Sequence, residues 1–196
     1  MNDDQTLRTA LLVIVLVVFP IGIYYRIQSQ ATGEKLDRWQ EGLFILATLR
    51  PLGLLLLLAV VAYLVDPASM AWSSMPFPAW LRWLGVGVCA TGGGLWLWTF
   101  RRLGKNLTDT VVTRREHTLV TQGPYRWVRH PFYDSVLLFV LGIALAAANW
   151  LLLVLGGTLF GLFVIRTRTE EEKLLGRFGA QYREYMARTG RFVPRM

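Results

Sequence analysis

The sequence predicts an all-α membrane protein: a polytopic helical bundle with about five transmembrane helices, a C-terminal helical hairpin among them. Three observations predict this fold. Hydrophobic residues make up 54% of the 196 residues, more than an ordinary soluble domain of this size contains. Four apolar runs are long enough to cross a bilayer, because about 20 helical residues span a hydrocarbon core ~30 Å thick. Lys and Arg lie in blocks between these runs.

The first two runs each predict one membrane-crossing helix. Leu7 to Tyr25 is followed directly by Arg26 and lacks a small-residue cleavage site, which indicates a retained anchor rather than a removed signal peptide. Leu43 to Val65 contains Arg50 and Pro51. Its first residues therefore form either a kinked entry to the helix or a separate interfacial turn.

The third and fourth runs predict closely packed helices. Trp80 to Phe100 is rich in small residues, which let neighbouring helices approach closely within lipid. These are Gly85, Gly87, Cys89, Gly92, Gly93 and Gly94. Phe132 to Ile165 has 34 residues with a single formal charge, Asp134, near its start, and is too long for one crossing and rather short for two. We therefore expect a tight helical hairpin that turns near Asn149.

The distribution of positive charge predicts the orientation in the membrane. Three, seven and eight Lys and Arg residues lie in Arg26 to Gly42, Arg101 to Pro131 and Arg166 to Met196, whereas Asp66 to Ala79 and the hairpin tip have none. Because cytoplasmic loops carry the excess of these residues, we expect the basic segments in the cytoplasm and the N-terminus outside. The membrane would be a bacterial or archaeal inner membrane, or the endoplasmic reticulum of a eukaryote.

Composition also excludes several function classes. The net charge of +8 could suggest nucleic acid, but the basic blocks lie between apolar runs, so membrane phosphates are the expected partner and nucleic acid is not. A single cysteine, Cys89, excludes an intrachain disulfide. With only His117 and His130 as imidazoles, we expect no metal site.

Two polar segments flank the predicted hairpin on its cytoplasmic side. The first, His117 to Tyr133, reads HTLVTQGPYRWVRHPFY. Gly123 and Pro124 predict a turn, and Pro131 suits the first position of a helix, whose start offers amide donors to an anion. The alternative is an interfacial loop whose aromatic residues form a membrane belt and whose arginines contact phosphates.

The second polar segment begins at Arg166 and reads RTRTEEEKLLGRFGAQYREY. Arg166 and Glu170 are four residues apart, on one face of a helix. They form either an exposed contact worth about 0.3–0.5 kcal/mol or, since Arg166 is the first charge after the apolar run, a functional pair at the bilayer boundary. Further on, apolar residues at helical spacing predict a cytoplasmic amphipathic helix. They are Leu174, Leu175, Phe178, Tyr182, Tyr185 and Met186.

In these two segments the chain resembles the isoprenylcysteine carboxyl methyltransferase and phospholipid methyltransferase families of integral membrane methyltransferases. The shared motifs are HTLV at 117–120, GPY at 123–125, RHPFY at 129–133, RTEEE at 168–172 and FGAQYREY at 178–185. The resemblance covers roughly Leu103 to Pro194. We expect one integrated domain, with three N-terminal spans in residues 1–100 and, in residues 101–196, a catalytic half that holds a cofactor-binding loop, the hairpin and the amphipathic helix.

The resemblance implies methyl transfer from S-adenosylmethionine to a lipid or lipophilic acceptor at the cytoplasmic membrane face. The cofactor-binding residues would be His117, Thr118, Leu119, Val120, Tyr125, His130, Pro131, Phe132, Tyr133 and Glu170. Arg166 matches a position that contacts the acceptor, and we expect it to be the catalytic residue that orients a carboxylate or phosphate. Physical chemistry agrees with this assignment, since a sulfonium cation needs aromatic faces and carboxylates near it.

The acceptor and the reaction class remain open at this stage. An isoprenylcysteine-type carboxylate needs no base, whereas a phospholipid amine must first lose a proton, for which His117 is the candidate base; a thiol is a third acceptor. Asp134 and Ser135 stand where many relatives have glycine, and Asp134 could alter acceptor choice or cap the helix. The alternative functions are an NADPH-dependent membrane reductase related to sterol reductases and a non-catalytic membrane protein.

Overall fold

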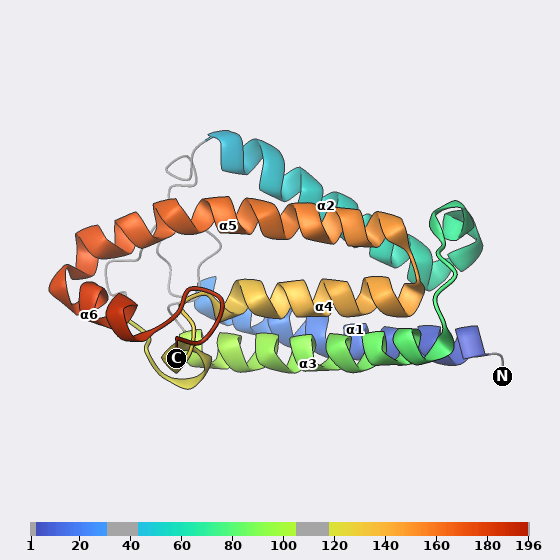
Figure 1. Cartoon of the computed structure of the whole chain (residues 1–196), viewed down its shortest axis with the longest axis horizontal. Coiled ribbons are helices and arrows are strands. Elements are labelled where there is room, and N and C mark those ends of the chain that lie inside the picture. The colour runs from blue at the N-terminus through green and yellow to red at the C-terminus, as the bar shows by residue number, and fades with distance from the viewer. Residues whose placement is uncertain (1–2, 31–42, 105–117, 196) are drawn as a thin grey trace.

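The structure, a computed structural model, describes residues 3–30, 43–104 and 118–195. Its helices are α1 (Asp3–Gln30), α2 (Leu43–Val65), α3 (Ala79–Leu103), α4 (Pro131–Ala147), α5 (Trp150–Phe178) and α6 (Ala180–Arg188), with the 3-10 helices η2 (Pro67–Ser73) and η4 (Gly123–Arg126). The long helices lie roughly side by side, and α2 inclines away from α5 toward the end that carries α6 (Figure 1). The described residues form no strand, which confirms the all-α prediction.

Among the described residues, three helical segments are long and apolar enough to cross a membrane: Asp3–Ser29, Ala47–Val65 and Trp150–Phe178. α4 is a shorter apolar helix of 17 residues. At 1.5 Å per residue its length is about 25 Å, against a hydrocarbon core of about 30 Å. Large apolar side chains such as Leu16 and Leu58 are exposed on the outer faces, as expected for contact with lipid. The chain is thus an integral membrane protein, and the number of crossings stays a prediction.

α3 packs against α4 at backbone contact through small residues. A Cβ added at Gly85 or Gly92 would lie 2.5 or 2.4 Å from an α4 backbone nitrogen, and one added at Gly142 would lie 2.2 Å from the Cys89 nitrogen. Gly87, by contrast, faces open space. The close packing predicted from the glycines of the third run is therefore present where they face α4.

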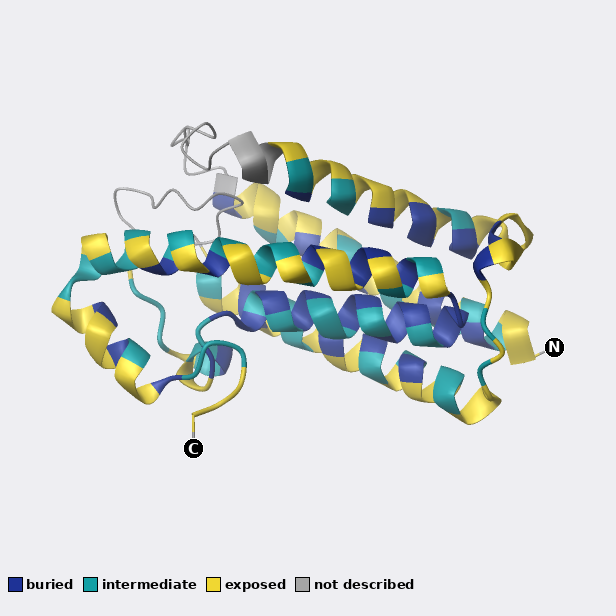
Figure 2. Ribbon diagram, turned by 45° about the horizontal axis from the view of Figure 1, so that its top comes forward, coloured by how far each residue is buried: buried dark blue, intermediate teal, exposed yellow. Residues whose placement is uncertain are grey.

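α4 and α5 form the predicted helical hairpin, and buried residues concentrate along α4 (Figure 2). α4 begins at Pro131, and Ala148 then adopts a left-handed conformation with φ 48°. Asn149 caps α5, because its Oδ1 accepts from the Leu152 amide at 3.2 Å, while its Nδ2 donates to Ser73 Oγ at 2.7 Å. The turn thus falls at Asn149, as the sequence predicts.

α5 continues into the second polar segment without a break. Its 29 residues extend about 43 Å, longer than the hydrocarbon core, so its charged end projects beyond the apolar region. Gly179, with φ 53°, ends α5, and the short helix α6 follows. The stripe expected from Leu174 to Met186 is therefore divided between two helices. Tyr182 and Tyr185 are buried against protein, so this part of the stripe does not face lipid.

Candidate functional site

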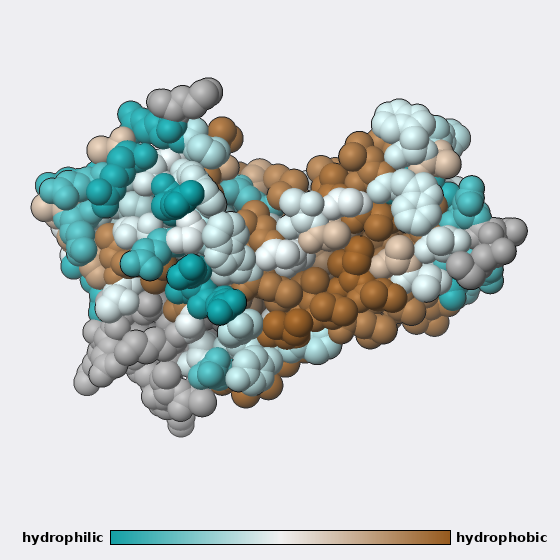
Figure 3. Space-filling model, turned by 90° about the horizontal axis from the view of Figure 1, so that it is seen from below, coloured by the Kyte–Doolittle hydropathy of each residue, from teal (hydrophilic) through white to brown (hydrophobic). Residues whose placement is uncertain are grey.

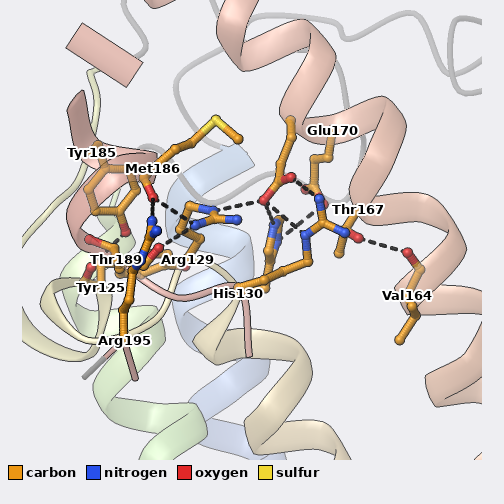
Figure 4. A network of polar contacts seen from close by, with 12 residues as sticks. Tyr125, Arg129, His130, Val164, Thr167, Glu170, Tyr185, Met186, Thr189 and Arg195 are labelled. Carbon is orange, nitrogen blue, oxygen red and sulfur yellow. Dashed lines mark hydrogen bonds and ion pairs between the residues drawn. The ribbon is translucent and has the colours of Figure 1, made fainter. Parts of the chain in front are cut away.

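Hydrophilic side chains gather over the end of the molecule that carries α6 and the C-terminus, whereas apolar residues cover much of the body (Figure 3). At this end the start of α4, the charged end of α5 and the segment after α6 come together (Figure 4). The two polar segments that flank the hairpin in sequence are therefore neighbours in space.

Glu170 lies beside an aromatic wall at this end. The Tyr133 hydroxyl donates to Glu170 Oε2 at 2.8 Å, and His130 Nδ1 is 3.7 Å from the same oxygen. Tyr133 stacks on Phe163 with ring centroids 4.3 Å apart and on His130 with an interplanar angle of 4°. The Glu170 side chain remains 26% exposed. A partly accessible carboxylate next to stacked rings is an arrangement that attracts an organic cation.

Arg166 and Tyr125 lie in the same region. Arg166 is half-buried on α5, one turn before Glu170, and interacts electrostatically with Tyr133. Tyr125, on η4, is within electrostatic range of Glu170, and its carbonyl accepts from the buried Tyr185 hydroxyl at 2.6 Å. A guanidinium and a carboxylate one helical turn apart give this region groups for both an anionic and a cationic ligand.

The other predicted cofactor residues lie along the loop and the helix start. Residues 118–120 precede η4 without regular structure. Pro131 is fully buried as the first residue of α4, and the Phe132 ring stacks on Phe100 of α3 with centroids 5.5 Å apart. His117 lies outside the described residues. The part of these residues in cofactor binding therefore stays a prediction.

The start of α4 is capped by backbone hydrogen bonds. This bears on two predictions: that the helix start offers amides to an anion, and that Asp134 could cap the helix. The amides of Tyr133 and Asp134 donate to the His130 carbonyl at 3.0 and 3.3 Å, so fewer amides are left for an anion than the sequence indicates. The N-cap residue is His130 rather than Asp134. The Ser135 hydroxyl donates to the Phe132 carbonyl at 2.6 Å, within its own helix.

Glu171, which sequence reasoning did not single out, lies at the centre of a buried ionic network. Arg129 Nε donates to Glu171 Oε1 at 2.8 Å, and His130 Nε2 is 3.3 Å from the same oxygen. Arg191 donates to both carboxylate oxygens, from Nε at 3.3 Å to Oε1 and from Nη2 to Oε2. Figure 4 shows Arg129 and His130 directed toward this part of α5. The network ties the RHPFY motif to both α5 and the C-terminal segment.

Comparison with known proteins supplies a family for these elements. The sequence model of the phospholipid methyltransferase family matches residues 80–181, slightly more than half of the chain. The chain is 32% identical over 120 residues to the protein-S-isoprenylcysteine O-methyltransferase of Tribolium castaneum, covering 59% of this chain and 42% of that protein. It is 36% identical over 94 residues to the Saccharomyces cerevisiae protein of the same name, covering 46% and 39% respectively.

The fold is similar to a solved structure, that of the eukaryotic intramembrane Ras methyltransferase (isoprenylcysteine carboxyl methyltransferase). The TM-score is 0.58 at 27% sequence identity, and the match covers 74% of this chain and 52% of the other. The chain spans about half or less of the length of these relatives. The residues matched by the family include η4, α4, nearly all of α3 and all of α5, the elements that surround Glu170 and Glu171.

Proposed function

Since this chain belongs to the phospholipid methyltransferase family, we propose that it is a methyltransferase that moves a methyl group from S-adenosylmethionine to a lipid or lipophilic acceptor. The observation that carries the proposal is the contact of Glu170 with Tyr133 and His130 at the open end of the hairpin. It joins a partly exposed carboxylate to aromatic faces at the end of a membrane-embedded bundle. Such a site suits a sulfonium cation whose reaction partner arrives from the bilayer.

The residues of the site fit S-adenosylmethionine. The 26% exposed carboxylate of Glu170 would accept from the amino group of the cofactor, and the His130 ring, whose Nδ1 is 3.7 Å from this carboxylate, would line the same side of the site. The rings of Tyr133, Phe163 and His130 stack beside this carboxylate, and aromatic rings next to a carboxylate favour a positive charge. Bound there, the cofactor supplies an activated methyl group and leaves as a neutral thioether.

The task of the protein in this reaction is to position the acceptor. Arg166 would hold a carboxylate or phosphate of the acceptor by paired hydrogen bonds, one turn from Glu170. The acceptor's lone pair can then be aligned with the methyl carbon, and alignment of this kind supplies much of the rate of a displacement reaction. The names of the similar proteins favour an isoprenylcysteine-type carboxylate, which needs no base. A phospholipid amine or a thiol would require one, and His117 is the candidate for an amine.

The charged end of the bundle is assigned to the cytoplasm. The blocks of Lys and Arg support this orientation, which leaves the N-terminus outside. The packing of α3 on α4 joins the N-terminal spans to the catalytic half, in support of one integrated domain. Cofactor would then enter from the cytosol and acceptor from the membrane.

Calorimetric titration with S-adenosylhomocysteine tests the proposal. The detergent-purified full chain is compared with the variants Glu170→Ala and Arg166→Ala. The matched control is Glu172→Ala, because Glu172 lies two residues after Glu170 and its side chain is exposed. We expect saturable binding that is lost in Glu170→Ala and kept in the other two. Arg166→Ala should instead lose methyl transfer to a prenylcysteine acceptor.

NADPH serves as the comparison ligand in the same titration. If the folded protein binds NADPH and not S-adenosylhomocysteine, the reductase reading replaces the methyltransferase. If it binds neither ligand, both enzyme hypotheses fail and the non-catalytic membrane protein is the remaining one.

A further inference from the structure

We propose that Glu171 is a positioning residue: it fixes the ring of His130 and ties the C-terminal segment 189–192 to the loop that carries His130. The inference rests on the proposed function, because it gives a task to a residue that lies behind the cofactor site. It starts from burial. The Glu171 side chain is only 5% exposed, and a buried carboxylate is costly unless it is paired and hydrogen-bonded.

The two neighbouring carboxylates on α5 address different nitrogens of one imidazole. Successive helical residues point about 100° apart. Glu171 Oε1 is 3.3 Å from His130 Nε2, and Glu170 Oε2 is 3.7 Å from His130 Nδ1. His130 thus lies between a fully enclosed carboxylate and a partly open one.

This arrangement assigns a hydrogen to one ring nitrogen. Glu171 is paired with two arginines, which keeps it ionised, and an ionised carboxylate can only accept hydrogen bonds. His130 Nε2 therefore carries the hydrogen that faces Glu171. The ring is held with Nδ1 turned toward Glu170, on the side where the cofactor is proposed to bind.

The same carboxylate joins two segments that are far apart in sequence. The backbone amides of Arg129 and His130 donate to the carbonyls of Gly190 and Arg191 at 2.8 and 3.1 Å. The side chains of Arg129 and Arg191, one from each segment, both donate to Glu171. Glu171 is therefore the common anchor of the contact between these two segments, and this contact includes His130.

The position of His130 depends on this anchor because its own backbone lies outside the helix. It is the N-cap residue of α4, with φ −123° and ψ 52°, and its ring is 5.8 Å from Phe192 of the C-terminal segment. A catalytic or cofactor-binding group that moves by about 1 Å can lose roughly 100-fold in rate. Loss of the Glu171 charge should therefore act on the cofactor through His130.

A double-mutant cycle on S-adenosylhomocysteine affinity tests this coupling. Glu171→Gln keeps the size and one acceptor oxygen but removes the charge, and Glu172→Gln is the matched exposed control. Glu171→Gln should weaken binding roughly 10- to 100-fold, and Glu172→Gln should not. In the His130→Ala background Glu171→Gln should have little further effect, since residues that act through each other are non-additive. Fully additive losses would overturn the proposal.

A second measurement separates this inference from the proposed function. The chain has only two histidines, so nitrogen-15 labelling of histidine gives two ring systems, and His117→Gln assigns the remaining one to His130. We expect a hydrogen on Nε2 in the wild type and a changed ring spectrum in Glu171→Gln. A ring protonated only at Nδ1, or a spectrum that the substitution leaves unchanged, refutes the positioning role. If the wild type does not bind S-adenosylhomocysteine, the proposed function is wrong, while the spectrum still decides the role of Glu171.

Discussion

The two ends of the α4–α5 hairpin satisfy buried polar groups in different ways. At the closed end Asn149 is 2% exposed and uses neutral partners, the Leu152 amide and the Ser73 hydroxyl. At the open end Glu171 is equally enclosed but uses ionic partners, Arg129 and Arg191. The closed end buries only neutral groups, as in an ordinary helix cap. The open end buries charged groups, whose removal from water costs more free energy.

The difference supports the proposal that the closed end holds the fold and the open end binds the ligand. Neutral hydrogen bonds that satisfy one another leave no capacity for a ligand. The ionic end also carries Glu170, whose carboxylate is partly exposed and touches Tyr133. Substitutions at the closed end should therefore change stability alone, and substitutions in the contacts of Glu170 and Glu171 at the open end should change ligand affinity first.

The largest expected effect falls on the seam between α3 and α4, on which both ends depend. Gly142→Leu would place a side chain where even a Cβ meets the Cys89 nitrogen at 2.2 Å. Since backbone cannot yield as a side chain can, we expect a loss of roughly 3 kcal/mol or more in stability, measured by unfolding in detergent. Gly87→Leu is the matched control, because nothing lies within 4 Å of a Cβ there. Equal unfolding midpoints for the two variants would contradict the packing.

The second effect tests the closed end. Asn149→Ala removes the cap of α5 and the bond to Ser73, and we expect a loss of about 2 kcal/mol in stability. Affinity for S-adenosylhomocysteine should not change. Asn149→Ser keeps an acceptor for the Leu152 amide and should recover part of the loss. A fall in affinity without a fall in stability would reverse the comparison between the ends.

The third effect tests the open end. Tyr133→Phe removes the hydroxyl that orients Glu170, and we expect S-adenosylhomocysteine to bind about tenfold more weakly, or ~1.4 kcal/mol. Tyr63→Phe is the control, because the Tyr63 hydroxyl hydrogen-bonds Arg82 near the closed end. This control should lower the unfolding midpoint and leave the affinity as it is. The opposite pattern would show that Tyr133 is only a packing residue.

Sequence reasoning reached the fold where local signals are strong. Pro131 and Asn149 are residue types with fixed preferences at helix starts, and both take the places expected of them. The division of the C-terminal stripe was missed, because its apolar spacing continues past the break. The signal that could have found it is Gly179 directly after Phe178, since glycine adopts the positive φ observed there at little cost.

The proximity of several predicted site residues is observed, whereas their roles stay a prediction. Glu170, Tyr133 and His130 are neighbours, as the motifs indicate. Glu171 was missed because three consecutive glutamates look alike in sequence, and only their phase on α5 decides which one is buried. Thr167 and Glu171, four residues apart and both buried, share the inward face. Arg191 could not be found locally, since its partner lies 20 residues away across a helix break.

The smallest expected effect concerns the Tyr185 hydroxyl, which holds the Tyr125 carbonyl beside the open end. Tyr185→Phe should cost about 1 kcal/mol in stability, the ordinary net value of such a hydrogen bond.

Desolvation by burial raises the pKa of Tyr185, so the folded state keeps this proton more tightly than the unfolded state. The contribution of the group is therefore complete below pH ~10 and is lost as pH rises toward the folded pKa. Tyr185→Phe should flatten that part of the alkaline loss of stability, measured as unfolding midpoints between pH 8 and about 11. Tyr24→Phe, at a side chain that is 60% exposed, should leave the slope of the wild type unchanged. An equal slope in all three proteins would mean that the hydroxyl is not buried in the folded protein.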